Sequence, residues 1–146
     1  MKNLFKPFLM AATVASLFFV NSCTKVCDPG FEGSDCKTEI RSKYVGTYTA
    51  SGTDNQGGTY TNWTVILSNS STNVLGIIIN LQNASISLNA TIADEGGSYT
   101  IASQNVGGFT YTGTGTLTSN AMTLQLNEVG GTPSVTTIFN FTGTKQ

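Results

Sequence analysis

The sequence predicts an all-β protein whose main domain is an eight-stranded antiparallel up-and-down (meander) barrel. Three observations predict this fold. From Tyr44 onward, apolar and polar residues alternate with a period of two, as in strands that have one buried face. The breaks between the alternating runs are short and rich in Gly, Asn and Ser, so consecutive strands should be neighbours. No stretch has the apolar period of an amphipathic helix.

The first 22 residues have the order of a secretory signal peptide. Lys2 and Lys6 give a positive start, and residues 8–20 form an apolar run of 13 residues. A helix that spans a bilayer takes about 20 apolar residues, so this run is too short to do so. The small residue Ser22 then precedes Cys23. We therefore expect residues 1–22 to be removed on export.

The end of this segment, Val20-Asn21-Ser22-Cys23, resembles the lipobox of bacterial lipoproteins. The resemblance implies that Cys23 carries acyl chains such as palmitate and becomes the first residue of the mature lipoprotein. Two or more acyl chains hold a protein stably on a membrane. Thr24 rather than Asp after the cysteine implies sorting to the outer membrane, on its periplasmic or its surface face.

The mature chain would have five basic and eight acidic residues and a net charge of −3. This balance excludes nucleic acid as a partner, because nucleic-acid binding requires a basic patch. Eight of the 13 charges lie between Lys25 and Lys43. We therefore expect a charged tether at residues 23–43 and the β-barrel domain at 44–146.

With Cys23 assigned to the lipid, Cys27 and Cys36 remain as a pair. An exported protein meets an oxidising compartment, so a disulfide between them is expected. Residues 27–36 also resemble the last disulfide loop of an EGF-like module, C-x2-G-[FY]-x-G-x2-C. The four upstream cysteines of that module are absent, so the loop is either a structural spacer or a recognition loop.

Each expected strand is an alternating run bounded by turn residues. The expected strands are residues 44–50, 59–67, 74–81, 85–93, 98–103, 109–118, 121–127 and 134–143. A β-sandwich is the alternative architecture, but its Greek-key crossings need longer connections than these. Val45-Gly46-Thr47-Tyr48 resembles the first-strand G-x-W motif of the lipocalin group, which implies a lipocalin-like (calycin-like) barrel.

The alternation assigns an inward and an outward face to each strand. The inward face should include Leu88, Phe109, Leu124 and Phe139, and the outward face Asn89, Thr110, Thr112 and Thr123. Several aromatic residues share the inward phase. They either fill a packed core or line an apolar cavity in which Trp63, Tyr99 and Tyr111 bind a ligand.

The residues of the common nucleophilic and zinc sites are missing. The chain has no histidine and no cysteine after Cys36, which removes Ser-His-Asp and Cys-His sites and the usual zinc ligands. The four carboxylates of the barrel (Asp54, Asp94, Glu95 and Glu128) all map to turns or strand ends. We therefore expect no catalytic residue, no metal, no cofactor and no titratable acid or base inside the barrel except tyrosine.

The sequence thus favours a lipid-anchored cell-envelope lipoprotein with a β-barrel binding or interaction domain. The partner could be a protein, a glycan or a small apolar ligand. A purely structural envelope lipoprotein and a lipocalin-like carrier of a small apolar ligand are the alternatives. An enzyme is the least favoured class.

Overall fold

The computed structural model describes residues 26–93 and 96–146. The expected signal peptide, the lipidation site Cys23, and Asp94 and Glu95 lie outside the described residues. In the described part of the chain, no helix is long and apolar enough to cross a membrane.

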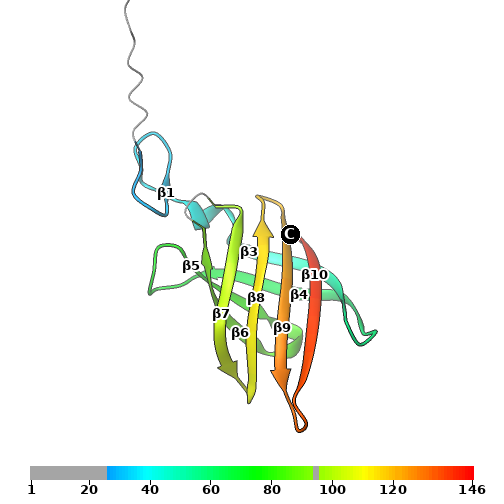
Figure 1. The fold of residues 1–146 in the computed structure, drawn as a ribbon. Coiled ribbons are helices and arrows are strands. Elements are labelled where there is room, and N and C mark those ends of the chain that lie inside the picture. Colours follow the sequence, from blue (N-terminus) through cyan, green and yellow to red (C-terminus); the bar gives the residue numbers. More distant parts are fainter. Residues whose placement is uncertain (1–25, 94–95) are drawn as a thin grey trace, which may run out of the picture.

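Residues 46–145 form a closed, eight-stranded antiparallel barrel in which each strand pairs with its neighbours in the sequence and the last strand pairs with the first (Figure 1). This confirms the predicted up-and-down barrel. The strands are β3 (Gly46–Asp54), β4 (Thr59–Asn69), β5 (Gly76–Leu81), β6 (Ile86–Ile92), β7 (Ser98–Val106), β8 (Phe109–Leu117), β9 (Ala121–Gly130) and β10 (Val135–Lys145).

Two β-bulges change the inward phase within a strand. In β4 the pairing with β3 shifts between Trp63 and Tyr60, and Asn62 has the left-handed backbone conformation with a φ of 56°. As a result, Tyr60 and Trp63 both pack against the core. In β7 a second shift, after Ile101, gives Val106 the inward phase as well. A bulge places an extra residue in one strand and so reverses the alternation beyond it.

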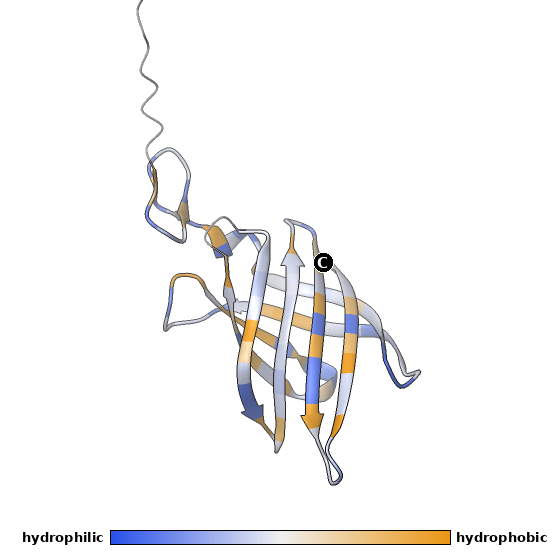
Figure 2. Ribbon diagram, viewed as in Figure 1, coloured by the Kyte–Doolittle hydropathy of each residue, from blue (hydrophilic) through white to orange (hydrophobic). Residues whose placement is uncertain are grey.

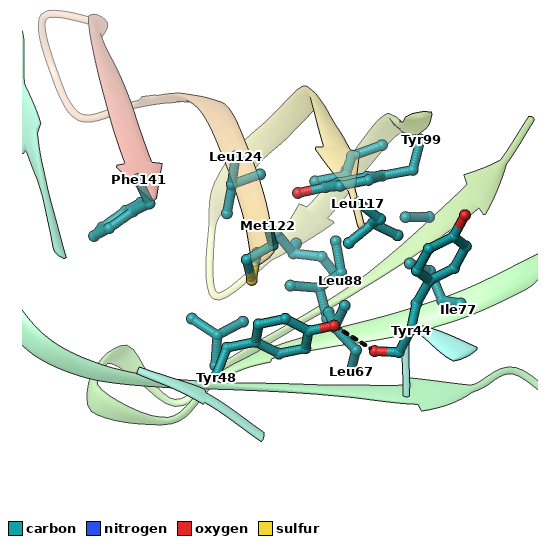
Figure 3. Close-up of a cluster of buried hydrophobic side chains, with 14 of the residues drawn as sticks. Tyr44, Tyr48, Leu67, Ile77, Leu88, Tyr99, Leu117, Met122, Leu124 and Phe141 are labelled. Carbon is teal, nitrogen blue, oxygen red and sulfur yellow. Dashed lines mark hydrogen bonds between the residues drawn. The ribbon is translucent and has the colours of Figure 1, made fainter. Parts of the chain in front are cut away.

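Side chains fill the barrel over most of its length (Figure 3). Leu88 and Leu124 are buried and Asn89 and Thr123 are exposed, as the alternation predicts, and Phe139 is half-buried. The hydroxyl of the fully buried Tyr48 donates a hydrogen bond of 2.7 Å to the carbonyl of Tyr44. A filled interior is typical of an eight-stranded barrel.

Phe109, which is predicted to point inward, is nevertheless 39% exposed. Phe109 has the inward phase, but it is the first residue of β8, where the interior of the barrel ends. Its ring lies against Gly130 at the end of β9, where a Cβ atom would clash with it. A residue's phase gives the face of the sheet but not the depth within the barrel.

The inward position of Gly115 in β8 makes room for a tyrosine. A Cβ atom there would clash with the ring and hydroxyl of Tyr99, which is buried beneath this strand. The Tyr99 hydroxyl donates a hydrogen bond of 2.7 Å to the carbonyl of Thr123 in β9. Glycine is therefore required at this position by close packing rather than by a turn.

A small disulfide-closed loop precedes the barrel (Figure 1). Cys27 and Cys36 are joined by the predicted disulfide, and β1 (Phe31–Glu32) pairs with β2 (Thr38–Glu39). The loop contacts the barrel, because Gly30 is packed so closely on Val74 that a Cβ atom would clash. The loop and the barrel are thus in contact at one end of the barrel, which we call the tether end.

The short 3-10 helix η1 (Ile40–Lys43) closes the tether end. Ile40 and Tyr44 are buried in the barrel core, although Ile40 precedes the residue at which the sequence analysis starts the barrel domain. Arg41 is also buried, and its guanidinium donates hydrogen bonds to the carbonyls of Ser70, Asn73 and Gly76 at 2.6–2.8 Å. Its Nε atom is 2.9 Å from a carboxylate oxygen of Glu39.

The pairing between β6 and β7 is the shortest in the barrel. Only Thr91–Thr100 and Ile92–Tyr99 are in register, whereas other neighbouring strands share five or more pairs. Farther along, the side-chain amide of Gln104 hydrogen-bonds to both the N–H and the carbonyl of Asn89, at 3.0 and 2.9 Å. A side chain thus replaces backbone pairing at this seam.

Candidate ligand-binding site at the barrel mouth

The end of the barrel opposite the tether end carries the candidate site, and we call it the mouth. The four hairpin connections of this end follow β3, β5, β7 and β9. Hydrophobic residues lie at the ends of the long strands β9 and β10 that form part of the mouth, at the bottom of Figure 2. Three apolar side chains are 38–51% exposed here and are called the rim: Phe109 and Val135, which have the inward phase, and Val129, which has the outward phase.

A cavity of about 70 Å³ lies inside the mouth. Its lining comes from β4, β5, the 3-10 helix η2 (Gln82–Ala84), β6, β9 and β10, and includes seven apolar side chains and one carboxylate. The lining residues are Trp63, Leu81, Ala84, Ile86, Leu126, Glu128, Phe139 and Phe141. Several of them are half-buried, so the cavity opens toward solvent.

Four aromatic side chains make up one side of the mouth. The ring centroids of Tyr60 and Trp63 are 5.0 Å apart in an edge-to-face arrangement. Phe141 is 5.2 Å from Trp63, and Phe139 is 5.7 Å from Tyr60. These separations are typical of packed aromatic pairs. The cluster gives this part of the cavity a rigid apolar wall.

Glu128 is the residue that the sequence analysis misplaced. The expected strand ended at residue 127, which put Glu128 outside the barrel, but β9 continues to Gly130. Glu128 therefore has the same inward phase as Leu124 and Leu126 and lines the cavity. The expectation that the interior contains no acid other than tyrosine was wrong. Continuing the alternation of Leu124 and Leu126 by one more step would have found this carboxylate.

Both described carboxylates of the barrel accept a hydrogen bond from a tyrosine at the mouth. The Tyr111 hydroxyl donates to Glu128 Oε2 at 2.7 Å, and burial together with this bond raises the pKa of Tyr111. The Tyr60 hydroxyl donates to Asp54 Oδ2 at 2.6 Å. This bond raises the pKa of Tyr60 to about 12 and lowers the pKa of Asp54. Both carboxylates therefore serve as hydrogen-bond acceptors for tyrosine hydroxyls.

Charge is distributed unevenly between the two ends. The described basic residues all lie in the tether or at the tether end, where Lys145 donates to the Lys43 carbonyl at 3.0 Å. Among the described residues of the mouth, only the acids Asp54 and Glu128 are charged, and the described ion pairs involve neither of them. The mouth therefore has negative potential that no described cation neutralises.

The structure brings two of the three predicted ligand-binding residues to the mouth. Trp63 lines the cavity directly. Tyr111 reaches it through the hydrogen bond to Glu128. Tyr99 lies elsewhere, beneath β8, where its hydroxyl binds a backbone carbonyl. Burial raises the pKa of Tyr99, so this residue stays neutral and serves packing.

The size of the cavity limits what can bind. A water molecule takes about 30 Å³ in the liquid, whereas sites for drug-sized ligands measure about 300–1,000 Å³. A cavity of about 70 Å³ therefore accepts a small group of a few heavy atoms, not a whole fatty acid or pigment. Among the described residues, no group of His, Cys, Asp and Glu side chains is placed to hold a metal ion.

The outer face of the barrel offers a different surface. Two shallow depressions share Thr114 and Gln125 and are lined mainly by threonine, asparagine and glutamine side chains. Many of these side chains bond to each other across the strands, as in the 2.7 Å contact between the hydroxyls of Thr116 and Thr123. This pattern is typical of a hydrated sheet face.

Fold and site together define a small, filled β-barrel with an acidic, aromatic cavity at one end. No known protein family, curated protein or solved structure matches the chain significantly. The function therefore has to be argued from the site itself.

Proposed function

We propose that the protein is a lipid-anchored cell-envelope lipoprotein whose β-barrel is a binding domain, with the cavity at the mouth as its site. The observation that carries this proposal is the inward-facing carboxylate of Glu128 in an open, otherwise apolar cavity. An apolar pocket that contains a few directed polar groups is the usual form of a ligand site. The Glu128 carboxylate is the one charged group among seven apolar lining side chains, and this contrast favours a binding function.

The arrangement of the two ends supports the anchored orientation. The chain enters the barrel through η1 at the tether end, and the mouth opens at the opposite end. A protein held through acyl chains on Cys23 in the outer membrane would therefore direct the mouth away from the lipid. In this proposal the EGF-like disulfide loop at residues 27–36 is a spacer that sets this orientation.

Two alternatives are less well supported. A purely structural lipoprotein would explain Glu128 as the acceptor for the hydroxyl of the buried Tyr111, but not the open cavity that this carboxylate lines. A lipocalin-like carrier would need a larger interior than the filled core and small cavity provide. A catalytic function has less support still, because glycoside hydrolysis needs two carboxylates facing one substrate and, among the carboxylates that the structure describes, Glu128 alone lines the cavity.

Membrane fractionation tests the anchor. The wild-type protein should remain with membranes after a carbonate wash and should incorporate labelled palmitate, whereas Cys23→Ala should lose the label and become soluble. Cys27→Ser with Cys36→Ser is the matched control, because it removes cysteines and leaves the lipidation site intact. A Cys23→Ala protein that stays with washed membranes would contradict the anchor.

Untargeted mass spectrometry of co-purifying molecules tests the site. We expect compounds that accompany the wild-type protein to be absent from Ala84→Trp, which places a large side chain at the edge of the cavity. Ser119→Trp, in an exposed turn at the tether end, is the control and should retain them. Equal retention by both variants would show that the mouth is not the site.

A further inference from the structure

We propose that the mouth recognises a methylated ammonium group of a small soluble molecule. This inference rests on the proposed binding function and specifies the chemistry of its ligand. The property that distinguishes the site is an anionic side chain set among aromatic and aliphatic groups.

The charge of the site favours a cation. Glu128 lines the cavity, and Asp54 holds the hydroxyl of Tyr60, whose ring is part of the aromatic cluster. The described lysine and arginine side chains lie in the tether or at the opposite end of the barrel. A bound cation would therefore be attracted by Glu128 without displacing a described partner cation, and an anionic ligand would be repelled.

The hydrogen-bonding capacity of the cavity favours a methylated cation over a primary amine. A primary ammonium has three N–H donors that each need an acceptor. The lining supplies seven apolar side chains and the Glu128 carboxylate, one oxygen of which already accepts a bond from Tyr111. A donor left without a partner is costly inside a protein. A trimethylammonium group has no donor, and its methyl groups suit the apolar lining.

Aromatic side chains add to this preference. Trp63, Phe139 and Phe141 line the cavity, and Tyr60 packs against all three. Aromatic rings attract cations through their quadrupole, and cages of aromatic residues bind quaternary ammonium ligands. The volume of about 70 Å³ suits a compact group rather than a long chain.

The orientation of the barrel favours a free solute over a lipid headgroup. The mouth lies at the end of the barrel away from the tether, and hence away from the membrane in the anchored protein. In that orientation, a headgroup of the same membrane would be far from the cavity. The ligand is therefore a small water-soluble molecule that carries the methylated ammonium group.

The intrinsic fluorescence of the protein measures this binding directly, because Trp63 is the single tryptophan of the chain and lines the cavity. Choline is the probe, titrated into the full mature lipoprotein in a non-ionic detergent. The comparison compounds are 3,3-dimethyl-1-butanol, in which a carbon replaces the nitrogen, and ethanolamine, which carries a primary ammonium. We expect choline to bind at least tenfold more tightly than either, and its affinity to fall as salt is added.

Matched carboxylate variants locate the charge. Glu128→Gln should weaken choline binding at least tenfold and remove the preference for choline over its neutral analogue. Glu32→Gln, which removes the same charge in the tether, should leave both unchanged. The comparison of choline with its analogue in the wild-type protein needs no variant, so it tests the proposal even if Glu128→Gln fails to fold.

Three results would overturn the inference. Equal binding of choline and its neutral analogue would show that charge is not recognised, while mouth binding itself would stand. Absence of any choline-dependent change in fluorescence would exclude this ligand class, and the co-purification experiment would still test the site. Binding of Cys23→Ala to phosphatidylcholine vesicles, without binding of free choline, would show that a lipid headgroup is the ligand.

Discussion

The interior of the barrel is covered at the tether end but partly open to solvent at the mouth. At the tether end, η1 covers the interior with Ile40 and Tyr44, and the buried Arg41 satisfies three backbone carbonyls of the β4–β5 connection. At the mouth, apolar side chains remain exposed on the rim, and a carboxylate faces a small open cavity.

In the proposed function, the tether end provides stability and the mouth provides recognition. The polar groups of the tether end are paired within the protein, which is the condition for burying them without a penalty. The mouth keeps an apolar surface and negative charge in contact with water, and such features are typical of interaction sites. The predictions below test whether the two ends differ in energy as they do in structure.

Truncation of Phe141 should have the largest effect. This side chain is buried and joins the core to the aromatic cluster of the mouth, so Phe141→Ala should lower the free energy of unfolding by about 3–5 kcal/mol. Urea denaturation measures the change. Val135→Ala, on the exposed rim, is the control and should change it by less than about 0.5 kcal/mol. Similar losses for both variants would mean that the rim is as tightly packed as the core.

Replacement of Arg41 tests the tether end. Arg41→Met retains the apolar stem but removes the three hydrogen bonds to carbonyls, so it should destabilise the protein by about 2–4 kcal/mol. Lys43→Met, which removes an exposed ion pair with Glu32, should cost less than about 1 kcal/mol. A small effect of Arg41→Met would show that the tether end contributes little to stability.

Removal of the disulfide should have a smaller effect. On the chain-entropy model, a loop of ten residues contributes up to about 3 kcal/mol. Because the loop packs on Val74 through Gly30, its loss should lower the melting temperature of the whole barrel. Differential scanning calorimetry of Cys27→Ser with Cys36→Ser checks this against the wild type. An unchanged melting temperature would show that the loop folds independently of the barrel.

The smallest effect is expected on the rim, for Phe109→Ala. Because this ring is partly exposed and touches Gly130 at the end of the barrel, truncation should destabilise by about 1 kcal/mol, well below the value for a buried phenylalanine. Phe139→Ala, with a side chain that packs against the core, should cost more. If both variants lose the same stability, Phe109 is buried in solution and the rim is closed.

Local alternation was sufficient to predict the eight strands and most of their inward residues, because each strand has one buried and one hydrated face. Alternation did not predict the inward residues beyond a β-bulge, where the register between two strands shifts. The bulge at Asn62 turns Tyr60 toward the core, and nothing in the alternation itself places a bulge there. Strand ends were also uncertain, because a strand continues as long as its neighbour pairs with it. Partner strands extend β9 to Gly130 and thereby bring Glu128 inside.

The structure of the tether end could not be predicted from local patterns, because it depends on contacts between residues far apart in the sequence. In the sequence, Arg41 is one more charged residue of a hydrophilic tether, and its carbonyl partners lie 29–35 residues away. The structure does not test the lipid anchor, because the lipobox resemblance concerns residues that the structure does not describe. The anchor stays a prediction.

The seam between β6 and β7 has a consequence for how the barrel moves. With only two residue pairs and one glutamine side chain in place of a full ladder, these strands resemble the edges of an open sheet more than the walls of a closed barrel. Local opening should begin where the fewest backbone hydrogen bonds must break. The amide protons of β6 near the mouth are therefore expected to exchange with solvent sooner than those of β9 and β10, and the barrel to part along this line before it unfolds.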